Sequence, residues 1–164
     1  MNNMKRQLVM ALVLMASTVA SLAQLSGNIT ISGNVANNTS ITVASQAGYN
    51  ALNITAGETD KLVAIATEKS NDRIGYTVTL TTANAPTGVA AFLKGVAGNA
   101  DTVPYTMKYN GTVVTLVAGS ATVTSVAART PQAGVAKNLT VTIPAVWVNT
   151  DTYSDTVTLT IAAN

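Results

Sequence analysis

The sequence predicts an all-β protein built as an antiparallel sandwich. From Ile29 onward, roughly ten short runs alternate between apolar and polar residues, at spacings of about 8–12 residues. Threonine and valine are frequent in these runs, and their branched side chains suit a pleated surface. No segment has a sustained apolar period of 3.6 residues, so the sequence does not favour a helix-based architecture.

The expected strands follow one another with turn residues between them. They cover residues 28–35, 39–44, 51–54, 61–66, 74–81, 103–109, 112–117, 121–127, 139–143 and 153–162. Segment 89–94 is either a short strand or one helical turn. Asn110-Gly111 predicts a hairpin, because both central residues of a type I′ turn need a positive φ. Segments 84–88 and 129–136 contain Pro and Gly and are expected to be loops.

The first 23 residues have the pattern of a secretory signal peptide. Lys5 and Arg6 precede an apolar run over 8–16, and Ser21-Leu22-Ala23 is a typical cleavage site. The apolar run is too short for a stable membrane span. We therefore expect export of the chain, an N-terminal extension over 24–37 and one domain over 38–164.

Charge and composition exclude several kinds of function. The formal charge of +2 is carried by the predicted signal peptide, so nothing in the rest of the chain indicates a nucleic-acid partner. The chain has no Cys and no His, which excludes nucleophilic triads that use them and the common zinc sites. Only 10% of its residues are charged and 48% are hydrophobic, which is a low charge for a freely soluble monomer. Assembly with other chains would cover part of such a surface.

No catalytic, cofactor or metal site is predicted. Glu58 and Asp60 are interpreted as a solvated turn rather than a calcium site, because too few oxygen ligands accompany them. Asp151 and Asp155 lie beside a turn and offer no cleft for acid–base catalysis. Trp147, the sole tryptophan, lies between apolar neighbours, which favours a core position over a ligand-stacking role.

The two ends of the exported chain carry related alternating segments. The first has one apolar phase that also contains Gly27 and Gly33, and its large members are Leu25, Ile29, Ile31 and Val35. The last expected strand has Tyr153, Val157, Leu159 and Ile161 in one phase. The first segment is either an ordinary first strand or one that inserts into another molecule. If the sandwich lacks one strand, the gap is expected beside the last one, where an open edge needs a cover.

The chain resembles fimbrial (pilus) subunits of the chaperone–usher class. The resemblance is carried by the signal peptide, the size of the exported chain, the segment Asn28-Ile29-Thr30-Ile31, the strand that begins Val103-Pro104-Tyr105, and the terminal strand 153–161. Without cysteines, the pattern is similar to colonisation-factor-type fimbriae and to spore-coat-U-like proteins. The terminal Ala162-Ala163-Asn164 departs from the aromatic residue that many pilins have next to last, which puts the chaperone contact there in doubt.

The resemblance implies an incomplete immunoglobulin-like sandwich that is completed by donor-strand exchange. Backbone pairing and alternate side chains in pockets are the features of such strand addition. The implied inserting positions are Leu25, Ile29, Ile31, Gly33 and Val35. The implied acceptor groove is lined by Tyr153, Val157, Leu159 and Ile161.

The expected function is that of a structural subunit of an adhesive surface fimbria. Its expected partners are other copies of itself in a head-to-tail polymer, a periplasmic chaperone and an outer-membrane usher, with a host or surface receptor as a further candidate. Its expected route leads through the periplasm to the cell surface. The alternative is a secreted sandwich that binds a surface ligand without polymerising, as an adhesin or spore-coat-type domain does. An enzyme is not expected.

Overall fold

The computed structural model describes residues 26–164 of the chain. Contacts divide the chain after Val35, and residues 36–164 form a compact domain. The strands of the described part are β1 Thr39–Ser45, β2 Glu58–Ser70, β3 Tyr76–Thr82, β4 Ala91–Gly95, β5 Thr102–Tyr109, β6 Thr112–Val113, β7 Ser120–Val126, β8 Val135–Ile143, β9 Tyr153–Ser154 and β10 Val157–Ala163. Within residues 26–164 there is no helix, which confirms the all-β prediction.

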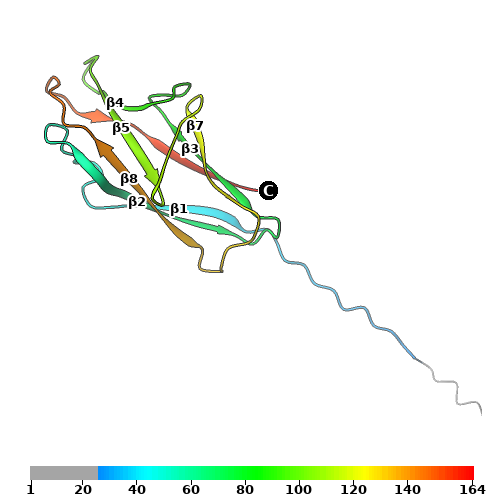
Figure 1. Ribbon diagram of the computed structural model, residues 1–164. Helices are drawn as coiled ribbons and strands as arrows, with labels where there is room; N and C mark the ends of the chain where they lie inside the picture. Colours follow the sequence, from blue (N-terminus) through cyan, green and yellow to red (C-terminus); the bar gives the residue numbers. More distant parts are fainter. Residues whose placement is uncertain (1–25) are drawn as a thin grey trace, which may run out of the picture. The chain divides into compact units, whose positions relative to one another are not determined.

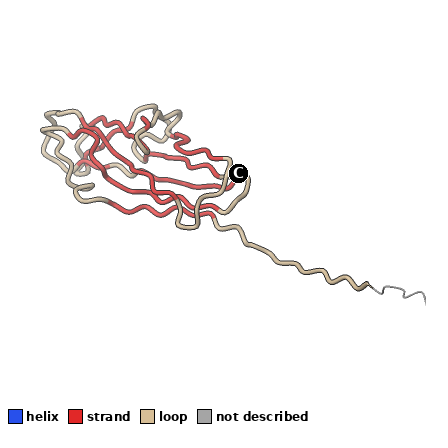
Figure 2. The backbone as a smooth tube through the Cα atoms, turned by 60° about the horizontal axis from the view of Figure 1, so that its bottom comes forward, coloured by secondary structure: helices blue, strands red, loops and turns tan. Residues whose placement is uncertain are grey.

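The strands form two antiparallel sheets that pack as a sandwich (Figure 1). The larger sheet has the order β1-β2-β8-β5-β4-β9, with β6 paired to β5, and the smaller has the order β10-β3-β7. The strands run along the length of the domain and leave their connecting loops at its two ends (Figure 2). The predicted antiparallel sandwich is therefore confirmed.

The core lies between the sheets and is built from the inward phase of each strand. On β3, Tyr76, Val78 and Leu80 are at most 2% exposed, while the threonines between them lie in the other phase. This is the period-two pattern of a strand with one buried face. The larger sheet contributes, among others, Ala64, Ala66, Val103, Met107, Leu139, Val141 and Ile143.

A buried carboxylate links the two sheets. Glu68 on β2 is 0% exposed, and its Oε1 accepts hydrogen bonds of 2.7 Å from the Tyr109 hydroxyl and from Oγ1 of Thr124. Its Oε2 accepts a 2.9 Å bond from the Tyr76 hydroxyl. A buried charge needs several such donors. Because Tyr109 lies in one sheet and Tyr76 and Thr124 in the other, the carboxylate holds the sheets together.

The last predicted strand is interrupted, which corrects the expectation of one strand over 153–162. The interruption lies at Asp155, whose Oδ1 accepts the backbone N–H groups of Asn84 and Thr156 and whose Oδ2 accepts the Tyr105 hydroxyl at 2.7 Å. These bonds hold the chain where it leaves the larger sheet as β9 and enters the smaller one as β10. Alternation continues through the bend, so the sequence pattern does not reveal it.

Other elements differ from prediction in local ways. Residues 51–54 are not a strand, because Asn53 Oδ1 accepts the Ala56 N–H at 3.0 Å and begins a turn. The ambiguous segment 89–94 contains the first four residues of the strand β4, and only two residues of 112–117 form β6. The predicted Asn110-Gly111 turn is confirmed, with φ values of 50° and 83°.

Candidate functional site: a groove between β1 and β10

Strands β1 and β10 are neighbouring edges of the two sheets (Figure 1). β1 is hydrogen-bonded to β2 on one side, and β10 to β3 on one side. Within residues 26–164, no strand pairs with the other side of either one. Unpaired N–H and C=O groups along such edges are available to a further strand.

The inward face of β10 is apolar and half-buried. Leu159 lies opposite Leu80 on β3, and Ile161 lies opposite Val78. Directly opposed residues share one face of a sheet, yet Leu80 and Val78 are 0% exposed whereas Leu159 and Ile161 are only partly buried. Val157 at the start of β10 is also half-buried. The inward face is thus fully buried on β3 and only partly buried on β10.

The neighbouring edge is β1, and the term groove denotes here the inward apolar residues of these two edges. Ile41 lies opposite Glu68 and Val43 opposite Ala66, so both point toward the sandwich interior. Ile41 is half-buried and Val43 is 50% exposed, although Glu68 and Ala66 are fully buried. The expected groove did not include these two positions. The alternating segment 39–44 that contains them was predicted as a strand, but the sequence does not indicate that this strand lies beside the last one.

The structure brings together three of the four predicted acceptor residues. Val157, Leu159 and Ile161 share the face of β10 described above. Tyr153 lies on β9 in the other sheet, where its hydroxyl accepts a 2.7 Å bond from Asn99 Nδ2 and donates to the Asn149 carbonyl. Tyr153 therefore braces a loop and is separated from the groove by the bend at 155–156.

One polar group at the end of the groove has no partner. Thr82 is 3% exposed and lies opposite Val157. Its hydroxyl has no hydrogen bond within the described part of the chain. A buried hydroxyl without a partner costs free energy, so this end of β3 is less well satisfied than the rest of the core.

The predicted inserting segment is exposed in its described part. Ile29, Ile31 and Val35 are 85%, 88% and 85% exposed, and a Cβ added at Gly33 would meet no atom within 4 Å. Leu25 lies outside the described residues, as do the predicted signal peptide and its cleavage site. No strand is present over 26–38, in contrast to the expected strand at 28–35. An alternating segment becomes a strand only when its backbone groups pair with a partner.

Burial and hydrogen bonding alter the acid–base properties of the inter-sheet tyrosines. Burial, with the hydrogen bond to Glu68, raises the pKa of Tyr76 to about 12. The same two causes raise the pKa of Tyr109 further. Burial and the bond to Asp155 also raise the pKa of Tyr105. These phenols stay protonated as donors, and their role is to hold the interior together.

The acidic residues that were candidates for chemistry are engaged in local structure. Glu58 Oε1 accepts the Asn53 N–H, and Asp60 forms a 2.8 Å ion pair with Lys108. Asp151 accepts the Ala97 N–H. Residues 26–164 contain no group of three acidic, His or Cys side chains that could hold a metal ion.

Trp147 is 92% exposed, so the expected core position is wrong. Its neighbours Val146 and Val148 are the residues that pack against the core. In an extended segment, successive side chains point to opposite sides. When the two valines face inward, the tryptophan between them must face solvent.

Comparison with known proteins does not identify a family for this chain, so a function can be proposed only from its sequence and structure. Neither the protein-family models nor the curated proteins give a match to this chain. In the described part of the chain, no helix has the length and apolar character needed to span a membrane.

Proposed function

We propose that the chain is a structural subunit of a surface fimbria, in which copies join head to tail by donor-strand exchange. The observation that carries this proposal is the pair of neighbouring unpaired edges, β1 and β10, whose inward apolar residues are only partly buried. Residues 24–37 of one copy supply the strand that fills this groove in the next copy. A contact between unlike surfaces that does not close on itself grows into a filament.

The chemistry of the two surfaces is complementary. Ile29, Ile31 and Val35 recur in one phase of the extension, and Leu159 and Ile161 recur in one phase of the groove. Full burial of a side chain such as Ile31 contributes about 1.5–3 kcal/mol. Backbone hydrogen bonds to the free edges add to this contribution. Gly33 lies in the inserting phase and presents no side chain, so it fits a shallow point of the groove.

Export and assembly partners belong to the same proposal. An open apolar groove is an aggregation hazard before assembly, so an exported subunit needs a temporary cover. The resemblance to chaperone–usher fimbriae supplies the class of partner: a periplasmic chaperone as the cover and an outer-membrane usher as the assembly platform. The assembled filament is placed at the cell surface, where it supports adhesion.

The proposal is tested by a charge placed in the inserting phase. Ile31→Asp is expected to abolish filaments, because an unpaired carboxylate would be buried in an apolar groove. Thr30→Asp is the matched control, since Thr30 lies in the opposite phase and its carboxylate would face solvent. Filament yield is measured as ladders resistant to mild denaturant. Equal yields from the two variants would refute insertion of this segment.

A second candidate function rests on the exposure of Trp147. An exposed aromatic side chain can stack on a sugar ring, and this supports a secreted sandwich that binds a surface glycan without polymerising. Glycan binding that is lost in Trp147→Ala, from a chain that stays monomeric, would favour this candidate over the fimbrial one.

A further inference from the structure

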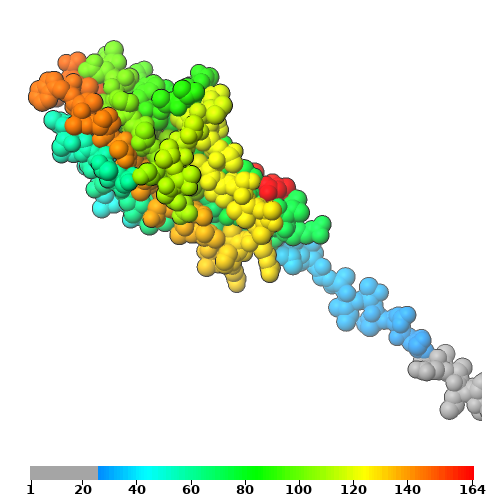
Figure 3. Space-filling model, in the orientation of Figure 1, coloured from blue at the N-terminus to red at the C-terminus, as the bar shows by residue number. Residues whose placement is uncertain are grey.

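The domain has two distinct ends. The base consists of residues 36–38, 71–75, 127–134 and Asn164. Asn71 Nδ2 donates to the Ala36 carbonyl, the Thr130 N–H donates to the Ser70 carbonyl, and the Asn164 N–H donates to the Gly75 carbonyl. The red end of the chain lies beside the green 70s residues in Figure 3.

The tip is the opposite end and consists of the loops 46–57, 96–101 and 144–152. These loops are tied to one another: the Val146 N–H donates to the Ile54 carbonyl at 3.2 Å, and both the N–H and the side chain of Asn149 donate to Asp101 at 2.9 Å. The bonds on both sides of Trp147 fix the loop that exposes it. The tryptophan is therefore displayed on a held surface rather than on a free loop.

The direction of β10 determines where the next domain lies, if the proposed strand exchange is correct. A donor between the two edges is antiparallel to one and parallel to the other, because β1 runs from the base at Thr39 to the tip at Ser45 and β10 runs the opposite way. The donor is taken as antiparallel to β10, which carries the larger apolar face, because antiparallel pairing is slightly more stable per residue than parallel pairing. β10 runs from Val157 at its tip side to Ala163 at its base side. A donor antiparallel to β10 leaves the groove at the Val157 end, so the donor's own domain follows at the tip.

The length of the extension is compatible with this arrangement. The seven residues of β10 span about 23 Å at 3.3 Å per residue. A donor that pairs along β10 leaves several residues of 24–37 to continue past Val157. Those residues carry the base of the donor's domain toward the tip loops of the acceptor.

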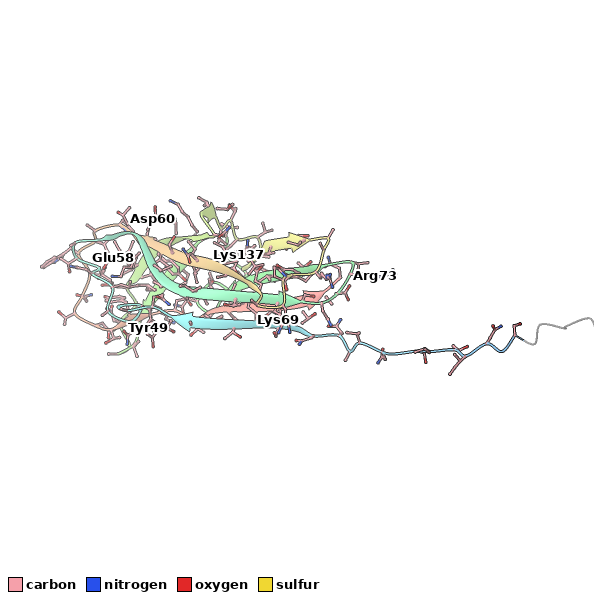
Figure 4. All side chains as sticks on the ribbon, turned by 90° about the horizontal axis from the view of Figure 1, so that it is seen from below. Tyr49, Glu58, Asp60, Lys69, Arg73 and Lys137 are labelled. Atoms are coloured by element: carbon pink, nitrogen blue, oxygen red, sulfur yellow. The ribbon has the colours of Figure 1, made fainter. Side chains whose placement is uncertain are left out.

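The charges of the two ends also favour a donor that is antiparallel to β10. The tip loops contain Asp101 and Asp151 and no Lys or Arg, and Lys94 lies at the adjoining end of β4. The base contains Arg73, Arg129 and one acidic residue, Asp72, and Lys69 lies at the adjoining end of β2. By side-chain charge the tip is therefore net acidic and the base net basic. Figure 4 shows Arg73 and Lys69 toward one end of the domain, with Tyr49 and Glu58 toward the other. Antiparallel insertion places a basic base on an acidic tip, whereas parallel insertion would place two basic ends together.

The base also offers apolar surface to an aromatic side chain. Ile74 is 54% exposed and Val126 is 37% exposed, and the side chain of Asn164 donates to the carbonyls of both. Arg73 lies next to Ile74 in the chain. An aliphatic surface beside a guanidinium is a favourable environment for an indole ring, through apolar contact and cation–π attraction.

We propose that the base of each copy rests on the tip of the copy that receives its donor strand, and that this contact covers Trp147. The occupant of the tip is thus a second copy of this chain. The inference rests on the proposed strand exchange and adds a second interface to it, between folded domains. That interface would fix the angle between successive subunits.

The single tryptophan makes the contact directly measurable. We compare filaments of the exported chain with monomers of the same chain whose grooves are filled by an excess of a synthetic peptide of residues 24–37, which has no tryptophan. Grooves are filled in both samples, but only filaments have domain contacts. The expected result is a blue-shifted emission and a severalfold lower sensitivity to acrylamide quenching in filaments alone.

The outcomes separate the contact from the strand exchange. Filaments whose tryptophan is quenched as strongly as in peptide-filled monomers would overturn the tip contact and leave strand exchange intact. Protection in the peptide-filled monomers would also overturn it, because the donor strand alone would then cover Trp147. Failure to form filaments or to bind the peptide would remove the proposed function itself.

A charge reversal gives an independent test. Arg73→Glu is expected to leave insertion of the strand intact and to raise tryptophan quenching in filaments toward that of monomers. Lys137→Glu is the matched control, because Lys137 lies on β8 between the two ends of the domain (Figure 4). Unchanged protection in Arg73→Glu filaments would contradict the proposed pairing of base and tip.

Discussion

The hydroxyl of Tyr109 donates a 2.7 Å hydrogen bond to Oε1 of Glu68, a carboxylate with no exposed surface. The two residues lie on β5 and β2, and the same carboxylate accepts from Tyr76 and Thr124 in the other sheet. Within the described residues this buried carboxylate has no ion-pair partner, so its charge is stabilised by the three hydroxyl donors alone. Loss of any one of them is therefore expected to be costly.

Glu68→Ala is expected to lower the free energy of unfolding by about 3 kcal/mol or more, because three buried hydroxyls lose their acceptor and a cavity remains. Tyr109→Phe, which removes one donor and keeps the ring, is expected to cost about 1–2 kcal/mol. Urea unfolding measures both. A smaller loss in Glu68→Ala than in Tyr109→Phe would contradict the bracing role of the carboxylate.

Alkaline pH should unfold the domain over a defined range. Because burial raises the pKa of Tyr76 from 10.0 to about 12, its protonated form contributes stability that is complete below pH 10. This contribution is lost as the pH rises from 10 toward about 12. Phenolate absorbance and circular dichroism are expected to change together in this range. A phenol transition of Tyr76 that is complete while the fold is intact would refute the prediction.

Gly75→Ala is expected to destabilise the domain by about 2 kcal/mol or more. Gly75 has a φ of 101°, and a Cβ there would overlap the carbonyl oxygen of Val126 on β7. Gly98→Ala is the matched control: its φ is 83°, but a Cβ there meets no atom within 4 Å. Thermal unfolding should show a clearly larger loss for Gly75→Ala.

Leu80 and Leu159 provide a measure of how open the groove is. Leu80→Ala is expected to cost about 2–5 kcal/mol, as in a closed core. Leu159→Ala should cost about 1 kcal/mol in monomers, because its side chain is already half in water. In filaments the two costs should converge. Equal costs in monomers would show that the core is closed at β10 without a donor.

Thr82→Val is expected to raise the free energy of unfolding by about 1 kcal/mol, since it replaces a buried hydroxyl without a partner by a methyl group of similar shape. Thr79→Val, at a half-buried position on the same strand, is the comparison. Loss of stability in Thr82→Val would mean that the hydroxyl has a partner, such as a bound water molecule.

Sequence alone predicted the strands better than their arrangement. Period-two patterns predicted most of them, and the left-handed preference of Asn110-Gly111 predicted the hairpin. Alternation does not say which strands are neighbours, so the contribution of Ile41 and Val43 to the groove was missed. Contacts between residues more than one hundred positions apart, such as those of β1 with β10, leave no local signal.

Two expectations, one strand over 153–162 and a core position for Trp147, fail because the local sequence pattern alone was used to assign them. A period of two assigns residues to two faces but does not say which face is inside. Around Trp147 the two valines take the inner face, and around Tyr153 the face continues unbroken through a bend made by Asp155. Packing of Val146 and Val148 against the core decides the case of Trp147, and the hydrogen bonds of Asp155 decide that of the interrupted strand.

The two edges that form the groove come from opposite ends of the domain's sequence, β1 at residues 39–45 and β10 at residues 157–163. The receiving surface therefore cannot exist until synthesis has passed residue 163, whereas the donor segment is made among the first residues. A chain cut short before residue 157 would carry a donor without a receiver. Under the proposed assembly such a fragment would occupy the groove of a growing filament and accept no successor, so incomplete chains would act as terminators and set a limit on filament length.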